Sequence, residues 1–359
     1  MKSLPNEPLV SILIPNYNYG HFLRHCLDSV ISQTYKNIEV IIQDNASTDN
    51  SYEIILEYQL KAMHGEIEFP IYADRNRRNL GSDRNATICA SKAEGKYLLF
   101  LSSDDALKPE YVERCVAIME ENSRVSMVMV HRDEIDDDGN VHPTPPFYNK
   151  SFVCDGESQA AVFMMAGIAV PTQVLLRAGS RLETFKYRFY QLQVAGDWYS
   201  NYLMACVGDI AYIKDALCEY RVHFGNETNE SEKNLLGVFE HFLLINAFNS
   251  IAKSIGYQKP QDKYDSAVQK LGGMCLRYTL KMLQNKEIEC AKKYLYLAVV
   301  FDEEIKNDKR YAELWDIVTA DHDFDEKLSK FEKENVLIRT ISYDPPEGYV
   351  EIDFENDQD

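Results

Sequence analysis

The feature of this sequence that most limits its fold is a regular alternation of short apolar runs with amphipathic segments, beginning at Leu9. Apolar runs rich in β-branched residues are typical of buried strands, and apolar residues at helical spacing form a stripe that packs on a sheet. The alternation therefore predicts a parallel sheet with helices on both faces. The predicted strands are residues 10–15, 38–43, 67–73, 97–101 and 126–131, and the predicted helices are residues 22–30, 52–58, 82–93 and a segment starting near 109.

The second half of the chain has a different pattern. Residues 149–228 mix helical and strand-like patterns, and they include a predicted helix at 197–206 and a strand-like stretch at 210–220. Beyond residue 231 apolar residues recur at helical spacing, which predicts the core of a helical bundle. From Asp344 onward there are acidic residues and no basic ones, and residues 349–354 alternate as an edge strand or a tail would. We expect three parts: residues 1–228, a helical domain at 229–335 and an acidic tail at 336–359.

Composition and charge exclude several classes of protein. The formal net charge of −19 argues against a nucleic-acid partner, because such binding relies on Lys and Arg that neutralise phosphates. The N-terminus is polar, and the longest apolar run, residues 160–170, is shorter than the roughly 20 residues needed to span a bilayer. Eight scattered cysteines without a CxxC pair are typical of buried thiols in a reducing compartment. We therefore expect a cytoplasmic protein.

Polar residues follow four of the predicted strands. Ligands of open α/β sheets bind beyond the carboxyl ends of the strands, so these loops are the candidate site. A nucleotide needs an aromatic face, an acceptor for its base or ribose, cations for its phosphates and a divalent metal. In that order, the loops offer Tyr17, Asp44, Arg78 with Arg84, and Asp104 with Asp105. Gly81 stands alone, so neither a P-loop nor a dinucleotide fingerprint fits.

Five segments in this order and spacing resemble family 2 glycosyltransferases of the GT-A fold. They are Val10 to Asn18, Leu27 to Thr34, Asp44 to Asp49, Asn79 to Gly81 with Arg84 and Asn85, and Phe100 to Asp105. The resemblance covers about residues 8–225. It implies an α/β fold, with a Rossmann-like GT-A domain of the nucleotide-diphospho-sugar transferases, here followed by the C-terminal helical domain.

The resemblance also implies roles for individual residues. Tyr17 is expected to pack on the donor base, Asp44 to contact base or ribose, and the stretch from Arg78 to Arg84 to lie beside the diphosphate. The full set expected to bind the donor is Pro15, Tyr17, Asn18, Asp44, Asn45, Arg78, Asn79, Gly81, Arg84, Ser103, Asp104 and Arg221.

A metal site and a catalytic base are implied as well. Mn²⁺ or Mg²⁺ is expected on Asp104, Asp105 and His223, although Ser102 replaces the first carboxylate of the family's Asp-x-Asp motif. Asp197 matches the family's late acidic residue and is the expected base for the acceptor hydroxyl, because a carboxylate at a helix N-terminus is well held. The alternative role of Asp197 is that of a simple N-cap.

These features predict an inverting transferase that moves a sugar from a UDP-, dTDP- or GDP-linked donor to a glycan, lipid-linked or other hydroxyl acceptor in bacterial cell-surface polysaccharide synthesis. Two other functions stay open. A sugar-nucleotide nucleotidyltransferase would need a glycine-rich basic loop after the first strand, and a non-catalytic nucleotide- or glycan-binding relative is favoured by Ser102. Peripheral association with the inner face of the membrane and a homo-oligomer formed through the C-terminal helices also stay open.

Overall fold

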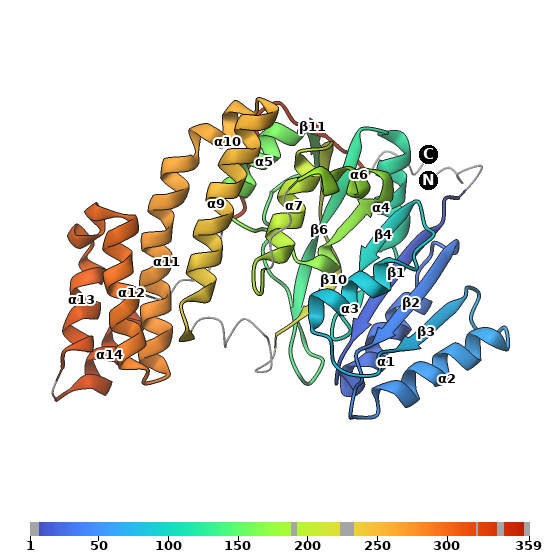
Figure 1. The fold of residues 1–359 in the computed structure, drawn as a ribbon, viewed down its shortest axis with the longest axis horizontal. Helices are drawn as coiled ribbons and strands as arrows, with labels where there is room; N and C mark the ends of the chain where they lie inside the picture. Colours follow the sequence, from blue (N-terminus) through green and yellow to red (C-terminus); the bar gives the residue numbers. More distant parts are fainter. Residues whose placement is uncertain (1–6, 188–191, 223–232, 321, 336–340, 355–359) are drawn as a thin grey trace.

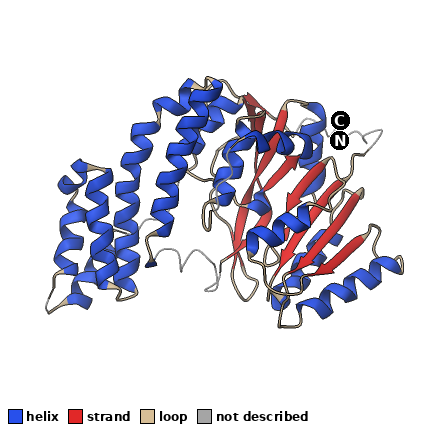
Figure 2. Ribbon diagram, viewed as in Figure 1, coloured by secondary structure: helices blue, strands red, loops and turns tan. Residues whose placement is uncertain are grey.

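The computed structural model describes residues 7–187, 192–222, 233–320, 322–335 and 341–354. A mixed sheet with helices packed against it occupies the N-terminal part, and the helices that follow residue 235 gather at one side of this sheet (Figures 1 and 2). The expected architecture, an α/β domain followed by a helical region, is confirmed.

The sheet of the described residues has eleven strands in the order β11-β8-β10-β6-β9-β4-β1-β2-β3, with β5 paired to β10 and β7 to β6. The strands are β1 (Val10–Asn16), β2 (Ile38–Asp44), β3 (Ile71–Arg75), β4 (Tyr97–Phe100), β5 (Ala106–Leu107), β6 (Val125–Ile135), β7 (Val141–His142), β8 (Phe152–Cys154), β9 (Val174–Arg177), β10 (Asp209–Arg221) and β11 (Val350–Glu351).

The sheet is parallel only in part. Strands β4, β1, β2 and β3 are parallel neighbours, and so are β6 and β10, but β9 runs antiparallel to both β4 and β6. The predicted strands thus share one direction, and β9, which the alternation did not predict, lies antiparallel between β4 and β6. The reason is the start of β9: the preceding 3₁₀ turn η1 (Pro171–Gln173) meets the end of β4 through Thr172, whose hydroxyl accepts a hydrogen bond from the Ser102 amide. A strand that starts where β4 ends must run the opposite way.

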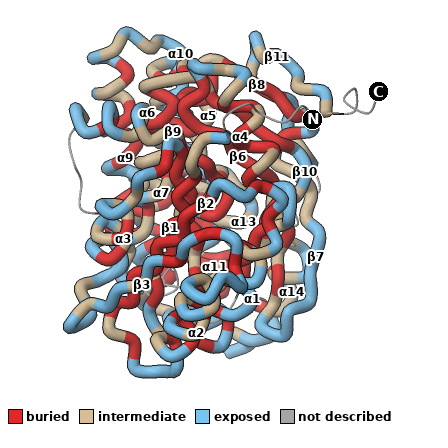
Figure 3. Tube along the Cα trace, turned by 90° about the vertical axis from the view of Figure 1, so that its right-hand side faces the viewer, coloured by how far each residue is buried: buried red, intermediate tan, exposed pale blue. Residues whose placement is uncertain are grey.

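Helices cover the sheet as the amphipathic segments predicted. Helix α1 buries Phe22, Leu23, Cys26, Leu27 and Val30 against the strands. The helices of this part are α1 (Gly20–Ile31), α2 (Ser51–Met63), α3 (Ser82–Ala90), α4 (Tyr111–Glu121), α5 (Gly156–Met165), α6 (Ala178–Glu183) and α7 (Gly196–Ala205). Figure 3 shows the buried positions concentrated along β1, β2 and β6.

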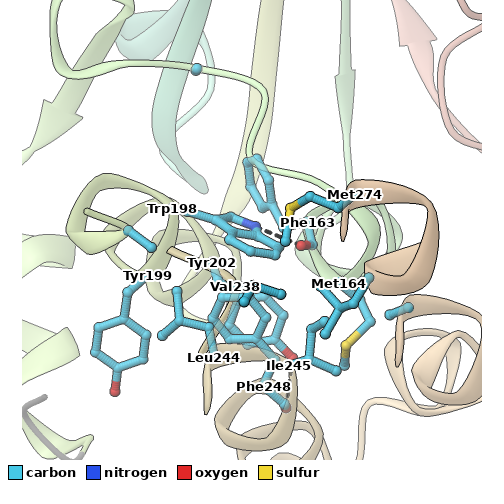
Figure 4. Packing of buried hydrophobic residues seen from close by; sticks show 14 of the residues in the cluster. Phe163, Met164, Trp198, Tyr199, Tyr202, Val238, Leu244, Ile245, Phe248 and Met274 are labelled. Atoms are coloured by element: carbon cyan, nitrogen blue, oxygen red, sulfur yellow. Dashed lines mark hydrogen bonds between the residues drawn. The ribbon is translucent and has the colours of Figure 1, made fainter. Parts of the chain in front are cut away.

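The C-terminal helices pack side by side and join the core of the sheet domain. They are α9 (Leu236–Ile255), α10 (Gln258–Asp262), α11 (Tyr264–Gln284), α12 (Ile288–Phe301), α13 (Lys309–Val318) and α14 (Phe324–Glu334). One hydrophobic cluster runs from α5 and α7 into α9 and α11 (Figure 4). In that view Trp198 of α7 and Met274 of α11 lie in the same packed group. The predicted helical core is thus continuous with the sheet domain.

The end of the described chain returns to the sheet. Val350 and Glu351 pair antiparallel with Val153 and Phe152 of β8, which makes β11 an edge strand, one of the two outcomes predicted for this segment. All eight cysteines are free thiols, and all but Cys290 are buried. Among the described residues, no helix combines the length and the apolar character that crossing a bilayer requires.

Candidate active site

Segments far apart along the chain meet in one cavity of about 210 Å³. Pro15 comes from the end of β1, Ser102 from the end of β4, and Asp197 from the first turn of α7. The remaining walls are formed by the turn η1, the start of β9, and the adjoining parts of α3, α6 and α7. Of the residues expected to bind the donor, only Pro15 lines this cavity, where it meets the expected base Asp197. The convergence of Tyr17 and Asp104 with Asp197 stays a prediction.

Asp44 orders the loops that follow β1 and β2. It is fully buried, and its oxygens accept hydrogen bonds from Asn16 Nδ2 at 3.0 Å and from the amide and hydroxyl of Ser47 at 3.0 and 2.5 Å. Arg75 Nε adds an ion pair at 3.2 Å. Each of these groups comes from the chain itself, so the carboxylate fixes loop shape in this structure. Its contact with base or ribose stays a prediction.

Asn45 holds the next loop in place. Its Nδ2 donates to Asn79 Oδ1 at 2.8 Å and to the Gly81 carbonyl at 3.3 Å, and its Oδ1 accepts from Asn76 Nδ2 and the Leu80 amide, both at 2.9 Å. Gly81 has φ +87°, a conformation that other residues rarely adopt. Asn45 and Asn79 therefore work as loop supports, and the backbone of residues 79–81 is held beside the sheet edge.

Other expected donor residues lie at the surface near these loops. The side chain of Tyr17 is 40% exposed, and the neighbouring Asn18 accepts a hydrogen bond from the Thr48 amide at 2.8 Å. Arg78 and Arg84 are exposed and form no ion pair with the residues that the structure describes. An aromatic face and two uncommitted cations are thus available beside an ordered loop, which suits a base and a diphosphate.

The Ser102–Asp105 loop is braced from two sides. Buried Asp105 accepts hydrogen bonds from the Thr172 hydroxyl at 2.5 Å and the Arg221 amide at 2.8 Å. Burial and the nearby Asp104 carboxylate raise the pKa of Asp105 to about 7. Arg221 is itself buried, and its Nε donates to the Asp104 carbonyl at 2.8 Å while its Nη1 donates to the Asp136 carbonyl. In this structure Arg221 supports the loop, and its contact with phosphate stays a prediction.

The structure describes two of the three residues expected to bind metal, Asp104 and Asp105. His223 lies outside the described residues. Among the described residues there is no group of three His, Cys, Asp or Glu side chains that could hold a metal ion. Asp104 is half-buried beside Asp105, and Ser103 between the strand end and these acids is buried. Carboxylate oxygens suit Mg²⁺ and Mn²⁺, ions that commonly take further ligands from substrate phosphates, so the donor set fits such an ion bound together with a diphosphate.

Asp197 sits in the first turn of α7, where Trp198 N donates to its Oδ1 at 2.7 Å. The helix begins at Gly196, so the N-cap position belongs to Ala195, although the Asp197 carboxylate still accepts an amide of the first turn. The choice between a structural role and the base stays a prediction. Burial raises the pKa of Asp197 to about 6, against the smaller lowering effects of backbone hydrogen bonds and Arg132. A carboxylate with such a pKa is a suitable general base near neutral pH.

Sequence reasoning missed the residue that holds the segment before Asp197. Glu240 of α9 is buried, and its carboxylate accepts hydrogen bonds from the amides of Gln193, Val194 and Ala195 at 2.6, 2.9 and 3.1 Å. A single acid on an amphipathic helix gives no sequence signal of such a partner. The helical region thus holds the backbone of residues 193–195, which leads into the helix that carries the expected base.

Residues 11–176 match the family described as glycosyl transferase family 2. The matched segment belongs to this family. An uncharacterized glycosyltransferase from Nostoc sp. is 31% identical over 221 residues, which are 60% of this chain and 66% of that protein. The chondroitin synthase of Escherichia coli is 32% identical over 139 residues, 39% of this chain and 19% of that protein. This chain therefore matches less than two thirds of the length of these relatives.

Solved structures share the fold of this protein at low sequence identity. TarS of S. aureus, residues 1–349 in complex with UDP-GlcNAc, has a TM-score of 0.51 and 14% identity, covering 90% of this chain and 83% of TarS 1–349. GalNAc-T7 with UDP, GalNAc and Mn²⁺ has a TM-score of 0.51 and 13% identity, covering 73% of this chain and 56% of its own. These likenesses establish the fold alone.

Proposed function

We propose that this chain is a metal-assisted inverting glycosyltransferase that uses a nucleoside-diphosphate sugar as donor. The observation that carries the proposal is the cavity shared by Pro15, Ser102 and Asp197, in which residues that follow β1 and β4 meet a carboxylate with a raised pKa. The family, and the UDP and UDP-GlcNAc named with two neighbours of the same fold, support a nucleotide-sugar donor.

Different residues bind different parts of the donor. Tyr17 offers a face for the base, and exposed Arg78 and Arg84 offer charge for the diphosphate. A divalent ion held by Asp104 and Asp105, together with His223, would neutralise negative charge on the diphosphate. The Mn²⁺ named with GalNAc-T7 supports this part of the proposal.

Asp197 acts on the acceptor. Its carboxylate takes the proton of the acceptor hydroxyl while the acceptor oxygen bonds to the anomeric carbon from the face opposite the diphosphate. The bond from that carbon to the phosphate oxygen breaks, and the nucleoside diphosphate leaves with the electron pair. One displacement of this kind inverts the anomeric configuration.

The biological setting follows from the relatives and the thiols. The chondroitin synthase among the bacterial relatives supports a role in cell-surface polysaccharide synthesis with a glycan or lipid-linked acceptor. Eight free thiols support a reducing, cytoplasmic location, where the protein works alone, at the inner face of the membrane or as a homo-oligomer formed through its C-terminal helices.

Substitution of Asp197 is the principal test. Asp197→Asn keeps the shape of the side chain and removes the base, so transfer should fall by about a thousandfold while UDP affinity stays unchanged. Transfer is measured as UDP release from UDP-GlcNAc with a panel of glycan acceptors, and affinity is measured by calorimetry with Mn²⁺. Asp137→Asn, in an exposed turn, is the matched control.

Three further outcomes decide between the alternatives. Asp104→Ala should remove the Mn²⁺-dependent part of UDP binding. An Asp197→Asn variant that transfers sugar at the parent rate would refute the base assignment. UDP-GlcNAc binding without release by the parent chain would support instead the non-catalytic relative that Ser102 favours.

A further inference from the structure

A second cavity, of about 400 Å³, lies on the other side of Asp197. Its walls are residues 165–170 after α5, the start of α7, and helices α9 and α11. The volume lies within the roughly 300–1,000 Å³ of small-molecule sites. Asp197 lines both cavities, so one residue borders the cavity next to β1 and β4 and the cavity next to α9 and α11.

One face of α11 lines this second cavity. The lining residues of the helix recur three or four positions apart, as one helical face requires. They are Ala267, Lys270, Leu271, Met274, Arg277 and Tyr278. Met274 packs in the cluster that contains Trp198 (Figure 4), and its sulfur lies 3.1 Å from His241 Nδ1. Burial lowers the pKa of His241 to about 4, so this ring is neutral at neutral pH.

The charge of the cavity opposes that of the whole chain. The formal net charge of the chain is −19, yet the lining holds Arg132, Lys270 and Arg277 and a single carboxylate, Asp197. Lys270 Nζ donates to the Met165 carbonyl at 3.0 Å, and Arg132 Nη1 donates to Gln173 Oε1 at 3.1 Å. Within the described part of the chain, none of the three cations forms an ion pair with a carboxylate.

The repulsion between the two α11 cations is not relieved by an acid. Lys270 and Arg277 are seven positions apart, which places them about two turns apart on one face. Both side chains are exposed on one side, and the partial burial of Lys270 together with the charge of Arg277 lowers the pKa of Lys270. A bound oxyanion between them would relieve this repulsion, since charge-assisted hydrogen bonds are the stronger kind.

We propose that this cavity is the acceptor site and that it selects an acceptor carrying an oxyanion, which Lys270 and Arg277 bind while Asp197 faces the acceptor hydroxyl. The inference rests on the proposed function, which it deepens by assigning the chemical class of the acceptor. Phosphate and carboxylate share the required chemistry, and the test separates them.

The test is ligand-detected NMR titration of the full chain with three sugars of the same ring and different charge: glucose 6-phosphate, glucuronate and glucose. It is run with and without saturating UDP and Mn²⁺, which fill the donor side. We expect the anionic sugars to bind about tenfold more tightly than glucose, and the Lys270→Gln/Arg277→Gln double variant to lose this preference. Lys253→Gln, an exposed lysine of α9, is the charge control and should bind as the parent does.

The outcomes separate this inference from the proposed function. Equal binding of glucose and the anions, or an anion preference that survives the double variant, overturns the oxyanion site. The tighter of the two anions identifies phosphate or carboxylate as the acceptor group. If UDP fails to bind, the proposed function fails, but the titration without UDP still reports on the oxyanion site.

Discussion

The loops after β1, β2 and β3 and the cavity between α7 and α11 satisfy their polar groups in opposite ways. In the loops, Asp44 and Asn45 are buried and receive their hydrogen bonds from neighbouring residues. In the cavity, Lys270 and Arg277 face the space without a carboxylate partner among the described residues. The first region is a preformed support whose shape precedes any ligand. The second holds two exposed cations that a ligand could pair with.

The largest effect that separates the two regions is expected from pH. Because burial raises the pKa of Asp197 to about 6, protonation below that value removes the base, and kcat/KM should fall about fiftyfold between pH 6 and pH 4. The measurement is the initial rate of UDP release across this range. UDP affinity measured from pH 8 to pH 4 is the control for Asp105, whose pKa is raised to about 7 and which therefore loses its charge before Asp197 does. A flat profile in a folded chain would contradict the assignment.

A smaller effect is expected when the preformed support is broken. Asn45→Ala removes four hydrogen bonds from the loop of residues 76–81, so the free energy of unfolding should fall by about 1–3 kcal/mol. UDP affinity should fall with it, because the backbone of residues 79–81 loses its anchor. Urea unfolding and calorimetry measure the two quantities, and Asn285→Ala at an exposed helix end is the control. Unchanged UDP binding would mean that the loop lies outside the donor site.

The smallest effect is expected from the exposed cations of the donor side. Arg78→Gln with Arg84→Gln should weaken UDP binding about threefold to tenfold at low salt and less at high salt, because exposed charges are screened. Stability should not change, since neither side chain forms an ion pair with the described residues. Calorimetry at two salt concentrations measures this, with Arg124→Gln as an exposed control. Equal affinity at both salt concentrations would remove the two arginines from the diphosphate site.

The fold was easiest to predict from the sequence at the buried strands. Strands β1 and β2 are buried along nearly their whole length, and such strands give the apolar runs that predicted them. The direction of β9 could not be predicted, because the contact of Thr172 with the end of β4 sets it. The strand predicted at residues 67–73 is Ile71–Arg75 in the structure. Ile67 and Phe69 are apolar and buried, but they lie ahead of the strand, so their burial was mistaken for the start of the strand.

The candidate site was predictable on one side only. The donor loops follow strands that the sequence predicts, so a site at the ends of these strands could be proposed in advance. The predicted meeting of Tyr17, Asp104 and Asp197 stays a prediction, because of these three only Asp197 lines the cavity that also contains Pro15 and Ser102. Lys270 and Arg277 could not be predicted as site residues. The apolar residues beside them predict that one face of the helix is buried, but not which part of the chain packs against that face. The same limit applies to Phe239 and Phe242 of α9, which belonged to a predicted core stripe and are 49% and 37% exposed.

Glu240 makes the two parts of the chain dependent on each other. A chain cut after residue 228 would leave the amides of residues 193–195 without their carboxylate acceptor, and the turn ahead of Asp197 would lose its anchor. If the helical region were replaced by that of a relative, Asp197 would keep its position only if the new helix also supplied an acid that accepts hydrogen bonds from these amides. The C-terminal helices thus influence catalysis through the position of Asp197, although they contribute no reacting atom.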